Sequence, residues 1–122
     1  MAEHNDLGKQ GETAAAVFLK QKGHQILALN FRFGRAEVDI VSQDGNIVVF
    51  TEVKTRSTER FGFPEEFVGR DKMKLMKDAA EEFLYRNQLD TEVRFDIVSV
   101  IVKNGRFSVH HIEDAFFYNE RD

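Results

Sequence analysis

The chain has 122 residues, enough for one compact domain whose core is built from aliphatic side chains and 12 phenylalanines. We therefore expect residues 1–122 to form a single domain. The lack of cysteine excludes disulfide bonds, a thiol nucleophile and a zinc site with thiolate ligands, and the formal net charge of −4 argues against a surface that binds phosphate everywhere. No window approaches the roughly 18 apolar residues of a membrane span, and the polar N-terminus lacks the layout of a signal peptide, which predicts a cytoplasmic protein.

A first helix is predicted from Leu7 to Lys22 by the spacing of its apolar residues. Glu12 lies three and seven residues before Ala15 and Leu19, so it falls on the stripe that faces the core. A carboxylate on this stripe is unusual. It either interacts favourably with the positive end of the helix dipole, which would contribute about 0.3 to 1 kcal/mol, or belongs to a functional site.

Three strands are predicted next. Apolar and polar residues alternate over His24–Phe33, and a turn at Gly34-Arg35 leads into a second strand that begins at Ala36. Asp44-Gly45 is a strong two-residue hairpin signal, and the following run, Ile47–Val53, is mostly apolar, as is typical of an interior strand.

The hairpin carries charged residues where apolar ones would be expected. If Asp44-Gly45 forms its turn, Asp39 lies opposite Phe50 and Glu37 opposite Glu52, and the alternation of side chains puts Lys54 on the same face. Like charges opposite one another destabilise a sheet, so this cluster indicates a compensating cation, either the lysine or a divalent metal. The alternative is a set of ordinary ion pairs on a solvated face, each contributing about 0 to 1 kcal/mol.

The rest of the chain predicts one more helix and two more strands. Ser57–Phe63 lacks periodicity and suits a mobile lid or a substrate-facing loop. A helix capped at Asp71 runs to Asn87. Strands follow at Glu92–Val102 and Arg106–Ile112. The order helix, three strands, helix, two strands predicts an α/β or α+β fold with one mixed five-stranded sheet flanked by helices. The second helix permits a parallel strand pairing, as in the α/β class.

Two further groups of polar residues are interpreted as structural. Arg94 and Asp96 share one face of their strand and are expected to form an internal ion pair. His110 and His111 look like a metal-binding pair, but adjacent strand residues point to opposite faces of a sheet. Neither pair is therefore assigned to a functional site.

The acidic cluster has the composition of a hard metal site. Asp39 and Glu52, with the Val53 carbonyl and waters, would provide oxygen ligands suited to Mg²⁺ or Mn²⁺. Such an ion can polarise a phosphodiester and activate water. Glu12 would be a further ligand or would contact a metal-bound water, and Glu37 would act from the outer shell of the site.

Basic residues gather in the strand end, the loop and the helix that follow this cluster. Positive groups next to a metal site can hold a polyanion over the ion, and we expect Arg56, Arg60 and Lys72 to contact phosphates. Lys54 would orient the attacking water or stabilise the charge of the transition state. Taken alone, the charge run favours the simpler alternative of a solvated helix face.

These residues also carry a resemblance to known families. Asp39 followed by Glu52-Val53-Lys54 resembles the PD-(D/E)xK nuclease signature, and Glu12 takes the position of the helix-borne acid of archaeal Holliday-junction resolvases. The whole chain is similar to the YraN-like family of uncharacterised bacterial proteins. The matching segments are Gly8–Ala15, Ala36–Val41, Val49–Arg56, the helix that contains Lys72, Arg94–Val98 and His111–Phe116.

This resemblance implies a restriction-endonuclease-like fold and a metal-dependent nuclease that hydrolyses phosphodiester bonds, with branched DNA in repair or recombination as an expected substrate. DNA is favoured over RNA as the partner, and no membrane partner is expected. A homodimer would suit junction cutting, because two active sites are then needed. One alternative is a nucleic-acid-binding module with a silent nuclease-like site. Another is an interaction protein that docks a partner through the tail Phe116-Phe117-Tyr118.

Overall fold

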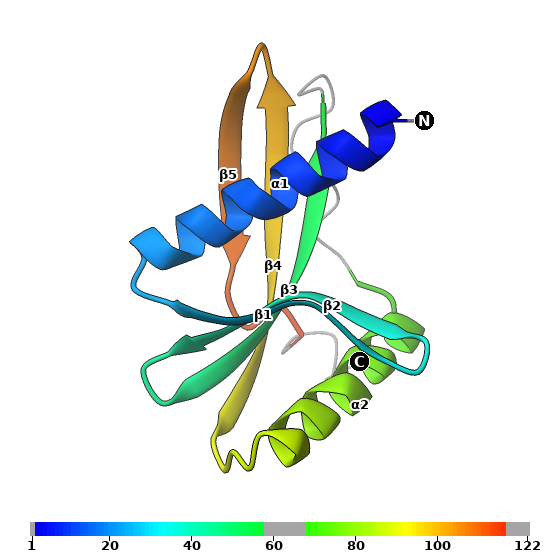
Figure 1. Cartoon of the computed structure of the whole chain (residues 1–122), viewed down its shortest axis with the longest axis vertical. Coiled ribbons are helices and arrows are strands. Elements are labelled where there is room, and N and C mark those ends of the chain that lie inside the picture. The colour runs from blue at the N-terminus through cyan, green and yellow to red at the C-terminus, as the bar shows by residue number, and fades with distance from the viewer. Residues whose placement is uncertain (1, 58–67, 117–122) are drawn as a thin grey trace.

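Two helices and five strands make up the protein, in the predicted order α-β-β-β-α-β-β (Figure 1). The computed structural model describes residues 2–57 and 68–116. The elements are α1 (Ala2–Gln21), β1 (Gln25–Phe33), β2 (Ala36–Asp44), β3 (Ile47–Arg56), α2 (Arg70–Arg86), β4 (Glu92–Lys103) and β5 (Arg106–Ile112). Within the described ranges, neither helix is both long and apolar enough to cross a membrane.

The strands form one mixed sheet in the order β1-β2-β3-β4-β5. β3 pairs with β4 in parallel, and the other neighbouring pairs are antiparallel. A parallel pair needs a long crossover connection, which contains α2 here. The predicted α/β fold with a mixed five-stranded sheet is confirmed, and the apolar run in β3 reflects its central position in the sheet.

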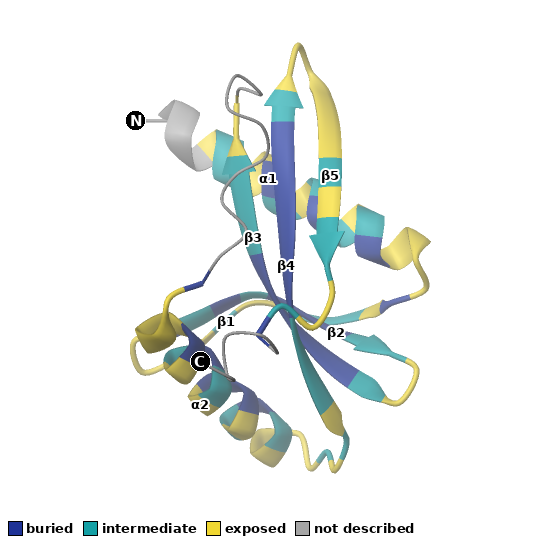
Figure 2. Ribbon diagram, turned by 180° about the vertical axis from the view of Figure 1, so that it is seen from behind, coloured by how far each residue is buried: buried dark blue, intermediate teal, exposed yellow. Residues whose placement is uncertain are grey.

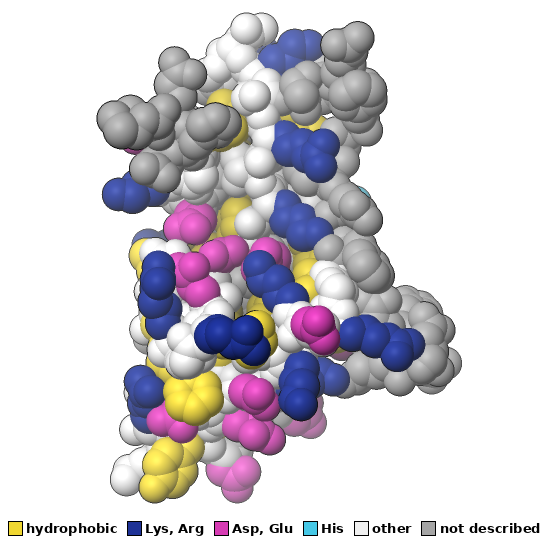
Figure 3. Space-filling view, turned by 90° about the vertical axis from the view of Figure 1, so that its right-hand side faces the viewer, with side chains coloured by type: hydrophobic (Ala, Val, Ile, Leu, Met, Phe, Trp, Pro, Cys, Tyr) yellow, Lys and Arg dark blue, Asp and Glu magenta, His cyan; other side chains and the backbone are white. Residues whose placement is uncertain are grey.

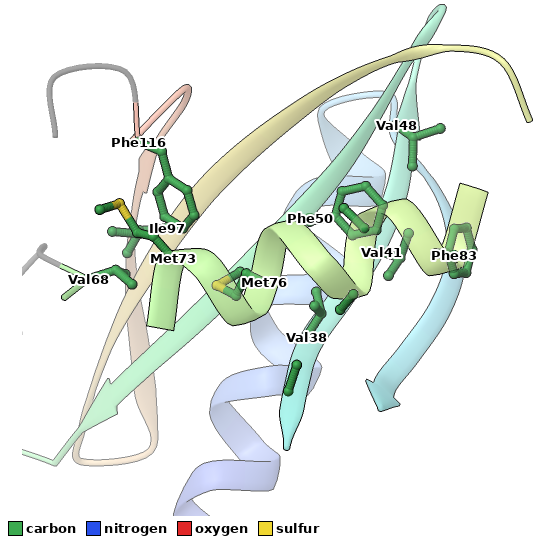
Figure 4. Close-up of a cluster of buried hydrophobic side chains, with 13 residues drawn as sticks. Val38, Val41, Val48, Phe50, Val68, Met73, Met76, Phe83, Ile97 and Phe116 are labelled. Atoms are coloured by element: carbon green, nitrogen blue, oxygen red, sulfur yellow. The ribbon is translucent and has the colours of Figure 1, made fainter. Parts of the chain in front are cut away.

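The two helices cover opposite faces of this strongly twisted sheet (Figures 1 and 2). α2 packs mainly on β2 and β1, where Phe50, Met76 and Phe83 belong to a buried cluster (Figure 4). α1 crosses β3, β4 and β5 on the other side, and its Ala15 and Leu19 are fully buried there. Each helix thus buries one apolar stripe, as the sequence pattern predicts.

The β2–β3 hairpin forms with a register two residues away from the predicted one. Asp44 pairs with Ile47 and Val41 pairs with Phe50, so the turn residues are Gly45 and Asn46 rather than Asp44 and Gly45. Gly45 has a φ of +62°, which suits a turn that needs glycine at its first central position. Because the shift is an even number of residues, Asp39 and Glu52 still share one face.

The observed helix boundaries also differ from the predicted ones. α1 begins at Ala2, five residues before the predicted start at Leu7. The N-cap of α2 is Gly69, without a side-chain cap, and Asp71 lies in the first turn instead of capping it, where its charge still suits the helix dipole. Of the predicted loop Ser57–Phe63, only the first residue lies within the described part of the chain.

α1 lies close against β3 at Gly11. A Cβ atom at this position would overlap the side chain of Thr55. Gly11→Ala should therefore destabilise the protein by about 1 to 3 kcal/mol, because the helix must move away from the sheet. Gly8→Ala is the control: no atom lies within 4 Å of its Cβ position, so it should be neutral or stabilise by up to about 1 kcal/mol. Urea denaturation measures both values, and equal effects would contradict this close approach.

Candidate metal centre

Asp39 stands where the pairing of β2 with β3 ends. The paired residues run from Asp44 with Ile47 to Ile40 with Thr51. The next residue of β2, Asp39, accepts a hydrogen bond from the Val53 backbone N–H through its Oδ2 atom, at 2.7 Å. The carboxylate thus takes the place of a backbone partner, and this bond holds it against β3.

Glu52 precedes Val53 on the central strand and is almost completely buried, with 9% of its surface exposed. Its Oε2 atom accepts a hydrogen bond from Lys72 Nζ at 2.7 Å. Lys72 comes from the first turn of α2, so this ion pair links the helix to the middle of the sheet. Lys72, which we expected to contact phosphate, is therefore paired with Glu52, which we expected to bind the metal.

The environment of Asp39 disfavours its charged form. Burial raises the pKa of this carboxyl most, the hydrogen bond from Val53 opposes the rise, and the charges of Glu52 and Glu12 add to it more than Lys72 subtracts. The pKa of Asp39 is thereby raised to about 7. A group of carboxylates with too little positive charge near it is a place where a cation binds favourably.

Glu12 extends from α1 toward this group. It is half-buried and accepts a hydrogen bond from Asn30 Nδ2 at 3.2 Å. Its charge is close enough to raise the pKa of Asp39, although the two residues lie on different elements. Glu12 is thus only partly turned toward the sheet, and its charge acts on Asp39 from the middle of α1.

Glu37 lies at the edge of the same region. It forms an ion pair with Arg32 at 3.4 Å and lines a cavity of about 430 Å³ between β2 and α2. The cavity lining also includes Asp39, Lys72 and Arg35, with Leu75 and Met76 below them. The cavity thus brings Asp39, Glu37 and Lys72 to one concave part of the surface.

The remaining predicted site residues follow on β3 and beyond it. Lys54 is half-buried two residues after Glu52, and Arg56 is exposed at the end of the strand. Arg60 lies outside the described residues. Figure 3 shows Lys and Arg side chains around a group of Asp and Glu side chains on one face of the molecule. Basic side chains thus lie beside acidic ones on this face, which is the arrangement that the sequence analysis expects near a metal site that binds a polyanion.

The side chains fit a hard divalent cation as a two-carboxylate site. Within residues 2–57 and 68–116, no group of three or more His, Cys, Asp or Glu side chains is gathered as a metal cluster. Asp39 and Glu52 remain the candidate ligands, and the ammonium group of Lys72 provides a positive charge on Glu52 in the absence of a metal. Oxygen donors of this kind suit Mg²⁺ or Mn²⁺.

A second polar network is separate from these residues and structural in character. Asp96 is fully buried, and its carboxylate lies 2.9 Å from Arg94 Nε and 2.7 Å from His111 Nε2 and accepts the Asp114 N–H at 3.0 Å. Burial acts to raise the pKa of Asp96, but the bonds from His111, Arg94 and Asp114 outweigh it and lower the pKa. The predicted internal ion pair is confirmed, with His111 as an additional partner.

The fold and these residues define an α/β domain with paired carboxylates at the end of a strand pairing and basic residues around them. The profile of the Uncharacterised protein family UPF0102 matches residues 11–100, and this chain belongs to that family. The match contains Glu12, Asp39, Glu52 and Lys54. Membership in the family predicted from the sequence segments, the YraN-like family, is thereby confirmed.

Relatives in several bacteria share almost the whole chain. A UPF0102 protein of Flavobacterium psychrophilum is 48% identical over 97% of this chain and 99% of its own length. One from Bacteroides thetaiotaomicron is 47% identical over 96% of this chain and 97% of its own length. One from Porphyromonas gingivalis is 42% identical over 95% of this chain and 87% of its own length.

Proposed function

We propose that this protein is a metal-dependent nuclease that hydrolyses phosphodiester bonds in nucleic acid. The observation that carries the proposal is the state of Asp39: its carboxyl is held against Val53 beside Glu52, and burial, with smaller contributions from the charges of Glu52 and Glu12, raises its pKa to about 7. A carboxyl with a raised pKa beside other carboxylates is typical of a functional site, and a bound cation would neutralise this group. The resemblance of Asp39 and Glu52-Val53-Lys54 to the PD-(D/E)xK signature supports the same conclusion.

The residues of the site have separate roles in this proposal. Asp39 and Glu52 hold the cation through carboxylate oxygens, with the Val53 carbonyl as a further ligand. When bound, a divalent cation supplies charge neutralisation and an acidified water at the phosphodiester. Lys54 stabilises the negative charge that develops on the phosphate, and Glu12 hydrogen-bonds to water at the site.

Substrate binding then depends on the basic residues around the carboxylates. Arg56, Arg60 and Lys72 contact phosphates, and these contacts position the substrate without reading its sequence. By the superfamily resemblance, the substrate is DNA, with branched structures in repair or recombination as the first candidates. The same resemblance favours a homodimer, in which two sites could cut a junction.

Cleavage of labelled branched, duplex and single-stranded DNA and RNA tests the proposal. With Mg²⁺ or Mn²⁺ we expect cleavage that EDTA stops, and Asp39→Ala or Lys54→Ala should reduce the rate by at least about 100-fold. Asp78→Ala is the control, since Asp78 is an exposed acid in the middle of α2. Cleavage that survives Asp39→Ala would overturn the nuclease assignment to this site.

The second candidate is a nucleic-acid-binding module without catalysis. The ion pair of Lys72 with Glu52 favours it, because a lysine already provides a positive charge at the centre of the site. In that case binding falls steeply with salt, but neither metal nor Asp39→Ala changes the integrity of the nucleic acid. The same panel of substrates, followed by a binding assay, separates this candidate from the nuclease.

A further inference from the structure

We propose that Lys72 is an exchangeable counter-ion: it pairs with Glu52 in the metal-free protein and transfers to a nucleic-acid phosphate when a divalent cation binds. This inference rests on the proposed function, because it requires a cation at Asp39 and Glu52. It adds that the cation and the nucleic acid bind cooperatively, with one lysine side chain as the link between them.

The two partners of the ion pair differ in their freedom to move. The Glu52 side chain is 11% exposed on the central strand, whereas the Lys72 side chain is 50% exposed at the start of α2. A lysine ammonium sits on a flexible four-carbon chain and makes no fixed bidentate geometry. Separation of the pair therefore means that Lys72 moves while Glu52 stays in place.

The side chain of Lys72 borders a cavity into which it can rotate. Its side chain lines the cavity of about 430 Å³ that also borders Asp39 and Arg35. The helix itself is fixed, because the neighbouring Met73 and Met76 are buried in the core (Figure 4). Lys72 can thus turn into the cavity by rotation of its side chain, without any movement of α2.

Charge makes the exchange favourable in one direction. Glu52 and Glu12 both place negative charge near Asp39, and the ammonium group of Lys72, 2.7 Å from Glu52, partly offsets it. A divalent cation brings two positive charges to the group in place of the single charge of Lys72. Once displaced from Glu52, the ammonium group of Lys72 is available to a phosphate of the nucleic acid. Arg35 lines the same cavity and adds a second positive charge for that phosphate.

This exchange predicts reciprocal coupling. If the cation releases Lys72 for the nucleic acid, the nucleic acid must raise the affinity for the cation by the same factor. Without the cation, Lys72 is engaged with Glu52 and contributes little to nucleic-acid binding. Lys72 is therefore a positioning residue whose effect depends on whether metal is present.

Calorimetric titration with Mn²⁺ tests the first half of the inference. Lys72→Met removes the competing charge and should tighten Mn²⁺ binding about tenfold. Lys74→Met is the matched control, because Lys74 is an exposed lysine in the same helix, and its effect should stay within about twofold. Equal affinities for the wild type and Lys72→Met would overturn the inference.

Fluorescence anisotropy with a phosphorothioate DNA duplex, which resists hydrolysis, tests the second half. Wild-type protein should bind the duplex more tightly when Mn²⁺ is added, and Lys72→Met should lose most of this gain while its metal-free binding changes little. A loss that is the same with and without Mn²⁺ would overturn the coupling. If Asp39→Asn abolishes Mn²⁺ binding but Lys72→Met has no effect, only this inference fails; if the wild type binds no Mn²⁺, the proposed function fails with it.

Discussion

Replacement of Asp96 with alanine is expected to destabilise the protein by about 3 to 5 kcal/mol. The carboxylate is fully buried, and three donors from β4, β5 and the following turn converge on it. Its removal leaves the guanidinium of Arg94 and the ring of His111 without their buried partner, and unpaired buried polar groups are costly. The Asp114 N–H also loses its acceptor, so the segment that places Phe116 in the core is loosened.

Urea denaturation at neutral pH measures this loss. Glu92→Ala is the control on the same strand, because Glu92 is exposed and its removal should change stability by less than about 0.5 kcal/mol. The pKa of Asp96 is lowered in the folded state, so its contribution is present above its ordinary pKa of 3.8 and is lost as the pH falls through the lower folded value. A loss below about 1 kcal/mol for Asp96→Ala would show that water replaces the network without cost.

The order and type of the elements could be predicted from local patterns. Alternation in the strands and the stripe in α2 each depend on residues a few positions apart. The turn residues of the β2–β3 hairpin were wrong by one position because both Asp-Gly and Gly-Asn can occupy a two-residue turn. The observed register therefore differs from the predicted one by two residues. Because side chains alternate between the two faces of a strand, a shift of two leaves Asp39 and Glu52 on the same face.

The contacts between elements could not be predicted in this way. The ion pair of Lys72 with Glu52 depends on the angle at which α2 crosses the sheet, and no spacing along the chain encodes that angle. Glu37 forms an ion pair with Arg32, its neighbour across the β1–β2 ladder, and this pairing depends on the strand register rather than on the order of residues along the chain. Sequence patterns thus identified the charged residues of the site, whereas tertiary packing decided which of them neutralise one another.

Asp39→Asn is expected to stabilise the metal-free protein above neutral pH, by on the order of 2 kcal/mol once the shift is discounted for a half-buried group. The folded-state pKa of Asp39 is raised from 3.8 to about 7, so the folded protein holds this proton more tightly than the unfolded chain. Wild-type stability therefore falls as the pH rises from about 4 to about 7 and then levels off. Asparagine carries no charge, and its side-chain oxygen can still accept the hydrogen bond from Val53.

Thermal or urea unfolding of both proteins between pH 4 and pH 8 gives the decisive comparison. The two curves should meet near pH 4 and diverge up to about pH 7, and Asp78→Asn should follow the wild type throughout. Added Mn²⁺ should then reverse the order at pH 8, because only the wild type gains stability from the bound cation. Parallel curves, unaffected by the metal, would mean that the carboxylate of Asp39 is neither destabilising nor a ligand. The Asp39 carboxylate would then lower the stability of the metal-free protein and raise that of the metal-bound protein. Such a residue is expected in a functional site, because selection for stability alone would favour its replacement.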